Sequence, residues 1–559
     1  MMKQLPIGID DFKKLIDKNA YYIDKTQFIV DCIKEECTLY TRPRRFGKTL
    51  NMSMLYYFFS NQEKDNAYLF NGLKVTNYPD VMKYQNQYPT IFITLKDMDV
   101  ETIDLSKNKF ASLIASVVEN HTYLFESHAL SDSQKRTLKK YQDKEASESD
   151  LRDALLNLST YLQRHFNQKV IILIDEYDVP LQSAYQNGYY NQMVGFLKNV
   201  FSSALKSNNH LEKGILTGCL RISKESIFTG LNNFNVYSIL DKGNEENFGF
   251  TENEVEQMLE DYCISNCFDD VKKWYDGYLF GDKEIYNPWS TIKYVQKNVE
   301  NHVTEPQSYW ANTSGNDIVY NYIKNATQQL KTEFEILMQG GTVIKGIKPE
   351  LTYREMDNIN NIYSFLLLTG YLKIKSKVEE IDEYNKNKTV TKYELIIPNE
   401  EVYQVYRNQF ADYFENYVSE RKEDLYHGLV EGNEKQVMTL LNEILSKSIS
   451  YYDNKESFYH GFLTGLFSGY TVESNRESGY GRFDLCIYPG KMSENVAVII
   501  ECKHSSEARN LVNDALKATE QILEKNYRQD LEGQGYEIRE YGISFFKKRC
   551  YVAKAKENV

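Results

Sequence analysis

The chain has 559 residues and a formal net charge of −13 at pH 7. At about 100–200 residues per domain, this length predicts about three to five domains or subdomains. The negative charge excludes a protein that coats nucleic acid with an overall basic surface, although a local basic groove or bound metal ions can still make such a contact.

Nothing in the sequence predicts secretion or membrane insertion. The N-terminal segment lacks the apolar run of a signal peptide, and no stretch approaches the roughly 18 apolar residues that a spanning helix requires. The 8 cysteines include no C-x-x-C pair, so they are typical of free thiols in a reducing compartment rather than of a zinc site. We therefore expect a cytoplasmic protein without membrane contact.

Residues 1–245 alternate short apolar runs with segments of helical periodicity. Four runs predict buried strands: 37–42, 90–95, 170–175 and 214–218. The helical patterns between them cover 104–125, 148–165 and 188–207. Strands that alternate with helices indicate a parallel sheet with helices on both faces.

The middle of the chain has a different pattern. Residues 246–345 are mostly helical, and Thr251 with Glu254 three residues later forms a capping-box signature. A helical stretch at 353–369 precedes two strand-like runs, GYLKIKSK and TKYELIIPN, which predict a helical unit with a β-hairpin wing. Residues 400–448 are charged and helical, as expected of a connector.

The last part of the chain returns to a mixed α/β pattern. Helices are predicted at 455–468 and 507–526, and strands at 482–488, 496–503 and near 541–546.

A phosphate-binding loop is predicted between the first strand and the next helix. Gly47, Lys48 and Thr49 supply the GKT end of the G-x-x-x-x-G-K-[ST] pattern. Lys48 would reach the β- and γ-phosphates of ATP, the Thr49 hydroxyl would bind Mg²⁺, and helix N-terminal amides would hold the phosphates. A GKT tripeptide alone is weak evidence, but the strand, loop and helix around it strengthen the prediction.

The loop departs from the pattern because Arg42 occupies the position of the first Gly. Pro43 restricts the turn further, and Arg44 and Arg45 add positive charge. These arginines, Arg45 in particular, could contact the nucleotide of this chain or of a neighbouring subunit in a homo-oligomer. A solvated basic turn is the alternative, and it is at least as common for any one of them.

An acidic pair, Asp175 and Glu176, follows the apolar run at 170–175. Asp175 would hold Mg²⁺, usually through water, and Glu176 would polarise the attacking water. Thr217, at the end of the 214–218 run, could contact the γ-phosphate, and Arg221 could supply positive charge to the transition state. An ordinary acidic loop is the alternative for the acidic pair, and a polar strand end with a surface ion pair is an equal alternative for Thr217 and Arg221.

A second acidic cluster lies near the C-terminus, in two neighbouring strand-like runs. Asp484 belongs to the first run, and Glu501 and Lys503 belong to the second. Because strand side chains alternate, Glu501 and Lys503 share a face, while Ile500 and Cys502 point to the other. If the runs pair as a hairpin, Asp484 lies beside Glu501, and two such close carboxylates repel unless a divalent cation binds between them.

This arrangement suits metal-assisted hydrolysis of a phosphodiester by Mg²⁺ or Mn²⁺. Asp484 and Glu501 would hold the metal, and Lys503 would orient the attacking water or stabilise the developing charge. Glu456 could add an acidic group and Gln521 could position substrate or water. A surface ion pair is the alternative, but Glu501 ends an apolar run, where an exposed pair is less expected.

These motifs resemble a bacterial and archaeal family of AAA-ATPase-like proteins with a C-terminal PD-(D/E)XK nuclease-superfamily domain. The matching segments run from residue 5 to about 503: LPIGIDDFKKL, YYIDKT, RPRRFGKT, LIDEYD, YDGY, YNPWS, LTGYLKI, IPNEEV, SNRESGYGRFD and IIECK. That family also has Arg at the position of the first P-loop Gly, so the departure at Arg42 does not imply an inactive site. The place of Asp24 and Lys25 is open; one guess is a position near the nucleotide base.

The resemblance implies an α/β fold in four parts. These are a P-loop ATPase core (1–245), a helical lid (246–345), a winged-helix-like region with a helical connector (346–448) and a restriction-endonuclease-like α/β domain (449–559). It also implies metal-binding roles for Asp484 and Glu501 and a catalytic role for Lys503, and it supports the roles of the P-loop and acidic-pair residues.

Two functions are compatible with these features. The first is an ATP-binding, ATP-hydrolysing protein that controls a C-terminal Mg²⁺-dependent nuclease acting on DNA or RNA. The alternative is a regulatory or signalling NTPase whose nuclease-like domain only binds nucleic acid or a partner. Because both sets of motif residues are complete, the first ranks higher.

Overall fold

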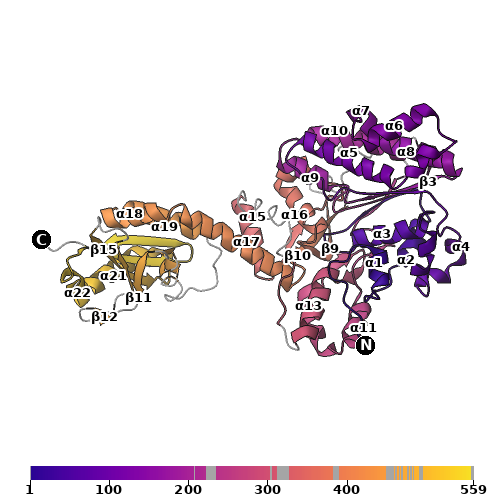
Figure 1. Cartoon of the computed structure of the whole chain (residues 1–559). Helices are drawn as coiled ribbons and strands as arrows, with labels where there is room; N and C mark the ends of the chain where they lie inside the picture. Colours follow the sequence, from indigo (N-terminus) through magenta and orange to yellow (C-terminus); the bar gives the residue numbers. More distant parts are fainter. Residues whose placement is uncertain are drawn as a thin grey trace. The chain divides into compact units, whose positions relative to one another are not determined.

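The computed structural model of the chain describes residues 2–206, 208–221, 234–301, 305–310, 327–381, 389–447, 459, 462–464, 466–467, 470–474, 477–478, 481–482, 484–489 and 495–555. The chain divides into two compact units, Met1–Asn316 with Ala326–Tyr406, and Asp317–Asn325 with Arg407–Val559. The boundary falls within helix α17 (Glu400–Ser419), shown in orange in Figure 1.

The first unit is built on a five-stranded sheet in which every pairing is parallel. Its order is β2-β3-β4-β1-β5. The strands are β1 (Cys37–Thr41), β2 (Thr90–Thr94), β3 (Val170–Asp175), β4 (Leu211–Gly218) and β5 (Phe234–Tyr237). The four predicted strands and the parallel sheet are confirmed, whereas β5 was not predicted from its short FNVY sequence.

Helices cover both faces of this sheet, with α3 on one side and α5 and α8 on the other (Figure 1). All six residues of β3 are buried: five apolar residues, as expected of a central parallel strand, followed by Asp175. The helices are α1 (Phe12–Asp17), α2 (Gln27–Cys32), α3 (Lys48–Phe59), α4 (Pro79–Met82), α5 (Ile103–Glu119), α6 (Asp132–Gln142), α7 (Glu148–Arg152), α8 (Ala154–Phe166), α9 (Val179–Gln186) and α10 (Tyr190–Phe201).

A small helical region follows in the same unit. Its first helix, α11 (Glu252–Asp261), begins at Thr251, and the reciprocal Thr251–Glu254 capping box is present as predicted. Two short paired strands and two more helices complete it: α12 (Phe268–Tyr275), β6 (Tyr278–Phe280), β7 (Lys283–Ile285) and α13 (Pro288–Asn301).

The predicted β-hairpin wing is also present. We call the segment from α15 to β10 the winged region; it contains α15 (Gln328–Met338), β8 (Val343–Lys345), a 3-10 turn at Tyr353–Asp357, α16 (Ile359–Leu368), β9 (Lys373–Ile381) and β10 (Thr389–Ile396). Its sheet has the order β8-β10-β9. Helix α16 is apolar and its described side chains are largely buried, so it presents no polar face for reading a DNA groove.

The second unit has a five-stranded sheet of order β11-β14-β15-β16-β17, in which β15 and β16 are parallel and the other pairs antiparallel. Its strands are β11 (Thr471–Ser474), β14 (Leu485–Tyr488), β15 (Val496–His504), β16 (Glu537–Phe546) and β17 (Arg549–Lys554), with a separate pair β12 (Glu477–Ser478) and β13 (Gly481–Arg482). The last strand, β17, was not predicted.

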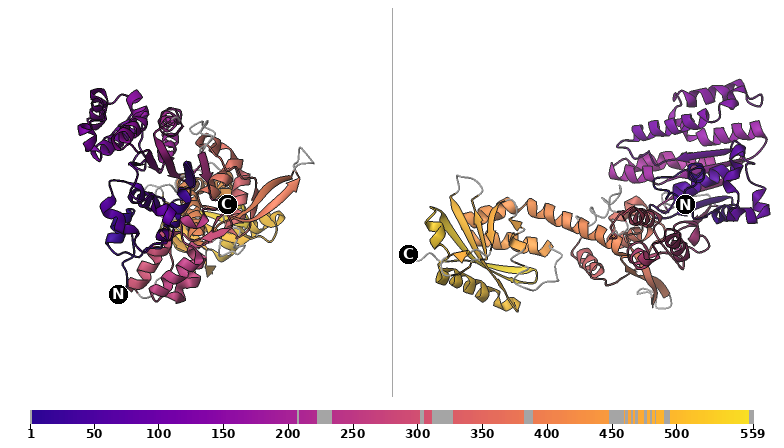
Figure 2. Two further views of the ribbon diagram at one scale, coloured as in Figure 1. Left: turned by 90° about the vertical axis from the view of Figure 1, so that its right-hand side faces the viewer. Right: turned by 60° about the horizontal axis from the view of Figure 1, so that its bottom comes forward.

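Helices cover both faces of this second sheet (Figures 1 and 2). Residues of α18 (Lys422–Glu431) and α19 (Glu434–Lys447) share an apolar core with one face. Residues of α21 (Leu511–Lys525) and α22 (Gln529–Glu532) pack on the opposite face. The compact unit therefore begins earlier than the expected boundary at 449, because α18 and α19 belong to its core rather than to a separate connector. Glu456 and most of the helix expected at 455–468 lie outside the described residues.

Candidate functional site

The predicted phosphate-binding loop connects β1 to α3, and its backbone turns sharply just before the helix. Arg45 and Gly47 adopt left-handed conformations, with φ of 72° and 80°. Gly47 is the N-cap of α3 and Lys48 is its first residue, so the amides of the first helical turn remain available to an anion.

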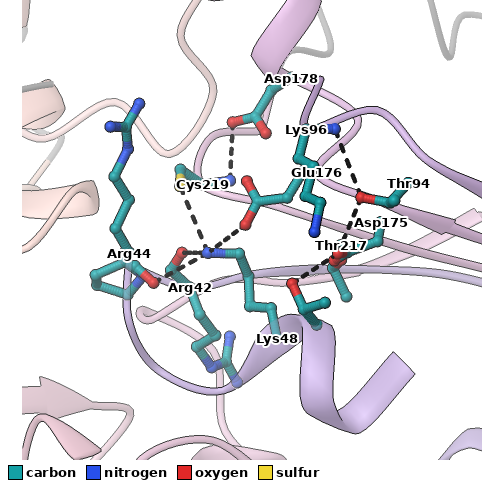
Figure 3. A network of polar contacts seen from close by, with 12 residues as sticks. Arg42, Arg44, Lys48, Thr94, Lys96, Asp175, Glu176, Asp178, Thr217 and Cys219 are labelled. Atoms are coloured by element: carbon teal, nitrogen blue, oxygen red, sulfur yellow. Dashed lines mark hydrogen bonds and ion pairs between the residues drawn. The ribbon is translucent and has the colours of Figure 1, made fainter. Parts of the chain in front are cut away.

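The Lys48 ammonium lies inside this loop and is buried (Figure 3). It donates to the carbonyls of Arg42 at 3.3 Å and Pro43 at 3.1 Å, and it lies 3.5 Å from Glu176 Oε1 and 3.6 Å from Cys219 Sγ. Burial alone would lower the pKa of Lys48, but Cys219, Glu176 and other neighbouring acidic groups raise it above its usual value. The loop therefore holds a charged ammonium, as contact with phosphate requires.

Three hydroxyl groups converge on the Asp175 carboxylate at the end of β3. Thr49 Oγ1 donates to it at 2.7 Å, Thr217 Oγ1 at 2.5 Å and Thr94 Oγ1 at 3.4 Å. Strand β4, which carries Thr217 near its end, lies between β1, which leads into the loop, and β3, which ends at Asp175. Burial and the neighbouring Glu176 raise the pKa of Asp175, although the Thr217 and Thr49 hydroxyls partly offset this.

Glu176, the second acid, has a φ of 54°, which is an unfavourable conformation for a residue with a side chain. Such strain is concentrated at functional sites. The Glu176 carboxylate points toward Lys48, with which it forms an ion pair (Figure 3), and 21% of the Glu176 side chain remains exposed. The structure thus brings Lys48, Thr49, Asp175, Glu176 and Thr217 together, as the sequence indicated.

Arg42 has a structural place behind the loop. Its side chain is fully buried, and its guanidinium donates to the carbonyls of Thr41 and Tyr237 at 2.8 Å and Asn244 at 3.0 Å. It also lies 5.2 Å from the ring centroid of Phe248. Burial lowers the pKa of Arg42 to about 10. The missing Gly is therefore replaced by a cation that ties the loop strand to neighbouring segments.

The remaining predicted contacts of this site point elsewhere. Arg45 is exposed, with its guanidinium 4.3 Å from the ring centroid of Trp289, in the YNPWS segment. Arg221 is ion-paired with Glu350 at 2.7 Å, and Arg44 donates to Gln182 at 2.8 Å. Contacts of Arg45 and Arg221 with a nucleotide remain predictions.

Asp24 and Lys25 join the N-terminal segment to its neighbours. Asp24 accepts from the backbone amide of Lys74 at 2.6 Å. Lys25 is buried and ion-paired with Glu254 of α11 at 2.6 Å. Both residues thus have structural contacts, and a place beside a nucleotide base remains a prediction.

Tyr177 and Asp178, which the sequence reasoning left without a role, bind the segment that follows β4. Asp178 Oδ2 accepts from the amides of Cys219 at 2.8 Å and Leu220 at 3.0 Å, and Tyr177 donates to the carbonyl of Leu220 at 2.5 Å. The signal was available: in a parallel sheet, residues after β3 and β4 must meet at the same edge. Burial and the nearby Glu176 raise the pKa of Asp178 to about 6.

Glu176, Asp178 and Cys219 each offer a ligand atom, and these atoms lie within 4.8 Å of one another. The Lys48 ammonium contacts two of these three residues. The cluster is therefore balanced by a protein cation, and we do not assign it a metal.

The C-terminal acids occupy one edge of the second sheet's central hairpin. Antiparallel pairing of β14 with β15 aligns Leu485 with Ile500, so the next position brings Asp484 opposite Glu501. Asp484 Oδ2 accepts from the Cys502 amide at 2.7 Å. The predicted hairpin is therefore present, and Ile500 and Cys502 point into the core on the other face.

Glu501 is buried, with 2% of its surface exposed, and it is the centre of this second site. Its Oε1 accepts from Lys503 Nζ at 3.3 Å and from the side-chain amide of Gln521 on α21. Gln521 also donates to the hydroxyl of Tyr527 at 3.3 Å, a buried residue that the sequence reasoning did not single out. The structure thus places Gln521, Lys503 and Asp484 around one carboxylate.

The electrostatics of Glu501 fit a cation. Burial and the neighbouring Asp484 carboxylate raise its pKa to about 7, while Lys503 opposes this shift. Its second oxygen, Oε2, is buried and has no hydrogen-bond partner among the described residues. A buried carboxylate oxygen without a donor is costly, and a divalent cation would satisfy it and remove the repulsion between the two acids.

The fold and the two clusters define the class of protein: a P-loop-like α/β core together with a nuclease-like α/β domain. Residues 6–228 match the family model of predicted AAA-ATPases, and residues 454–555 match that of the PD-(D/E)XK nuclease superfamily. The chain therefore carries an AAA-ATPase-like region and a C-terminal PD-(D/E)XK nuclease-superfamily domain, as the sequence resemblance implied.

A protein of Azotobacter chroococcum mcd 1, described as an uncharacterized protein in the vnfD 5' region, is 26% identical over 314 residues. The alignment covers 56% of this chain and 54% of the relative, so the chain matches about half of the relative's length. No helix among the described residues is long and apolar enough to cross a membrane.

Proposed function

We propose that this protein binds and hydrolyses ATP and thereby controls a Mg²⁺-dependent nuclease in its C-terminal domain, which cleaves DNA or RNA. The observation that carries the proposal is the Glu501 carboxylate, which is buried, next to Asp484 and has one oxygen that no described residue bonds. Such a carboxylate is unfavourable for stability alone and is suited to binding a metal.

The nucleotide half of the proposal rests on the Lys48 loop. Lys48 would exchange the Arg42 and Pro43 carbonyls for the β- and γ-phosphates, and α3 would add its first amides. Thr49 and Asp175, already 2.7 Å apart, would hold Mg²⁺ together. When Lys48 turns to the phosphate, Glu176 would be released to polarise the attacking water, and Thr217 would orient the γ-phosphate or that water.

The nuclease half assigns one task to each side chain around Glu501. Asp484 and Glu501 would hold Mg²⁺, or Mn²⁺ in its place, and the bound ion would supply charge neutralisation for the scissile phosphate and a more acidic water. Lys503 would orient that water and stabilise the charge that develops on the phosphate. Gln521 holds Glu501 in place and could position the substrate.

Two further expectations belong to this proposal. The exposed Arg45 leaves open a homo-oligomer in which one subunit contacts the nucleotide of another. The free cysteines suit a cytoplasmic location, where thiols stay reduced. Glu456 lies outside the described residues, and its role as an additional acidic group of the nuclease site remains a prediction from the sequence.

One experiment tests both halves. The full-length protein is incubated with single- and double-stranded DNA and RNA, with Mg²⁺ or Mn²⁺, with and without ATP, and with Asp484→Ala and Lys48→Ala in parallel. We expect cleavage that disappears in Asp484→Ala and changes with ATP only when Lys48 is present. ATP hydrolysis without cleavage of any substrate would instead favour the regulatory NTPase whose nuclease-like domain only binds.

A further inference from the structure

The segment that follows β4 is held firmly against the acidic strand end. Asp178 accepts the amides of Cys219 and Leu220, and Tyr177 donates to the Leu220 carbonyl. Tyr177 and Asp178 are the last two residues of the LIDEYD motif, directly after Asp175 and Glu176. The backbone of Cys219 and Leu220 is thus fixed to the site, and Arg221 is the next residue along the chain.

This fixed segment borders the phosphate-binding lysine. Cys219 Sγ lies 3.6 Å from Lys48 Nζ, and Thr217, two residues earlier, donates to Asp175. Arg221 lies two residues after Cys219, the residue of this segment that contacts the lysine expected to hold the terminal phosphate of ATP. A guanidinium is well suited to such a phosphate because it offers several fixed donors.

In this structure Arg221 is engaged by the winged region instead. Its guanidinium lies 2.7 Å from Glu350, and its carbonyl accepts from the Leu351 amide at 3.2 Å. About a third of each side chain in the ion pair is exposed, 31% for Arg221 and 34% for Glu350, so the pair has room to open. Exposed pairs of this kind are weak and change an equilibrium by about 5-fold or less, so a phosphate can compete for the cation.

The winged region also touches the loop itself. A Cβ atom on Gly370 would lie 3.1 Å from Cβ of Pro43, a tight contact, and the φ of Gly370 is +90°, so a residue with a side chain would be strained there. The ring of Tyr353 packs 5.8 Å from that of Tyr185 on α9. The winged region that binds Arg221 thus also packs against the phosphate-binding loop and α9, so a change of partner at Arg221 alters a contact of this region.

We propose that Arg221 is a latch with two exclusive partners, Glu350 in the nucleotide-free protein and the γ-phosphate of bound ATP. The proposal rests on the ATP-binding part of the proposed function. Because the γ-phosphate would draw the Arg221 side chain away from Glu350, ATP opens the contact with the winged region, and Glu350 weakens the binding of ATP. ADP, which lacks the γ-phosphate, leaves the latch closed.

The test compares the affinities of AMP-PNP and ADP, each with Mg²⁺, by calorimetry on the full-length protein. Glu350→Gln removes the competitor and is expected to tighten AMP-PNP binding by about 2- to 5-fold while leaving ADP binding unchanged. Arg221→Gln is expected to weaken AMP-PNP binding, and Glu350→Gln should add nothing to it in the double variant. Glu284→Gln, which opens the Lys373 ion pair at 3.2 Å elsewhere in this unit, is the matched control.

A charge reversal, Arg221→Glu with Glu350→Arg, separates the latch from simple loss of packing. The reversed pair keeps an ion pair between the two segments. Its melting temperature should therefore return to the wild-type value, above that of either single variant, but its preference for AMP-PNP over ADP should stay lost. Unchanged affinities in Glu350→Gln, or equal changes for both nucleotides, would overturn the latch. A wild-type protein that binds neither nucleotide would overturn the proposed ATP site first, and the latch with it.

Discussion

The two acidic sites of this protein differ in how the negative charge of their carboxylates is compensated. At the end of β3, the acids Asp175 and Glu176 are compensated within the protein by the Lys48 ammonium and by the Thr49 and Thr217 hydroxyls. At the β14–β15 hairpin, Glu501 accepts from Lys503 but lies beside the Asp484 carboxylate and keeps an oxygen without a donor in the described part of the chain.

The difference teaches what each site is prepared to bind. A site that already contains a buried cation is suited to an anionic ligand, which can bind that cation. A site in which two acids lie together and a buried carboxylate oxygen has no donor in the described residues is suited to a metal cation. The following substitutions test this contrast, from the largest expected effect to the smallest.

Asp484→Asn should reduce cleavage of nucleic acid by at least about 100-fold, because a metal contributes several kcal/mol to the transition state. The amide keeps an acceptor for the Cys502 amide, so the hairpin should stay intact. The rate of cleavage is measured alongside ATP hydrolysis, which should not change. Glu473→Gln, on the neighbouring β11 and bonded to the Tyr488 hydroxyl at 2.6 Å, is the control and should keep its activity.

Lys48→Ala should weaken ATP binding by about 10- to 100-fold, as expected for the loss of a charged hydrogen bond to phosphate. Calorimetric titration with ATP and Mg²⁺ measures this directly. Lys96→Ala removes an exposed lysine just beyond β2 and should leave the affinity nearly unchanged. Equal losses in both variants would mean that general positive charge, rather than the loop lysine, attracts the nucleotide.

Thr217→Val should slow ATP hydrolysis by about 10-fold while changing the affinity for ATP much less. The variant removes the 2.5 Å hydrogen bond to Asp175 and leaves that buried carboxylate short of a donor, a loss of about 1–2 kcal/mol. Thr94→Val removes the longer contact, 3.4 Å, to the same carboxylate. If Thr94→Val has the larger effect on turnover, the assignment of Thr217 to the reaction fails.

Glu501→Gln should raise the melting temperature of the metal-free protein at pH 8 by a few degrees and have little effect near pH 5. The folded state raises the pKa of Glu501 from 4.5 to about 7, so the folded carboxyl retains its proton where the unfolded one has lost it. Wild-type stability therefore falls as the pH rises between these values, and the amide variant escapes that loss.

Thermal unfolding in a chelator at both pH values measures this difference. Glu520→Gln, on the exposed side of α21, is the control and should shift the melting temperature little at either pH. A Glu501→Gln protein that is less stable than the wild type at pH 8 would show that the carboxylate serves the fold rather than a metal.

Features encoded locally could be predicted from the sequence. The apolar run 170–175, the GKT turn, the capping box at Thr251 and the alternation that puts Glu501 and Lys503 on one face are all present in the structure. Each depends on residues close together in the chain, whose periodicity or capping pattern is visible without knowledge of the fold.

Long-range features could not be predicted in this way. The burial of Arg42 depends on carbonyls of Tyr237 and Asn244, which lie far along the chain, and the Arg221–Glu350 pair joins two separate regions. The packing of α18 and α19 on the second sheet likewise depends on β16 and β17, which come about a hundred residues later. Charge and helical pattern alone are the same for a connector and for a helix on a sheet.

The measurement that tests the central claim most directly is the rate of nucleic-acid cleavage without nucleotide and with ATP, ADP or AMP-PNP, in the wild type and in Lys48→Ala. The account predicts that ATP and AMP-PNP change the wild-type rate by at least about 5-fold, within the usual range of coupling between two sites, and that Lys48→Ala keeps the nucleotide-free rate throughout. Identical rates under all four conditions in the wild type, with ATP shown to be bound, would contradict control of the nuclease by the ATP site.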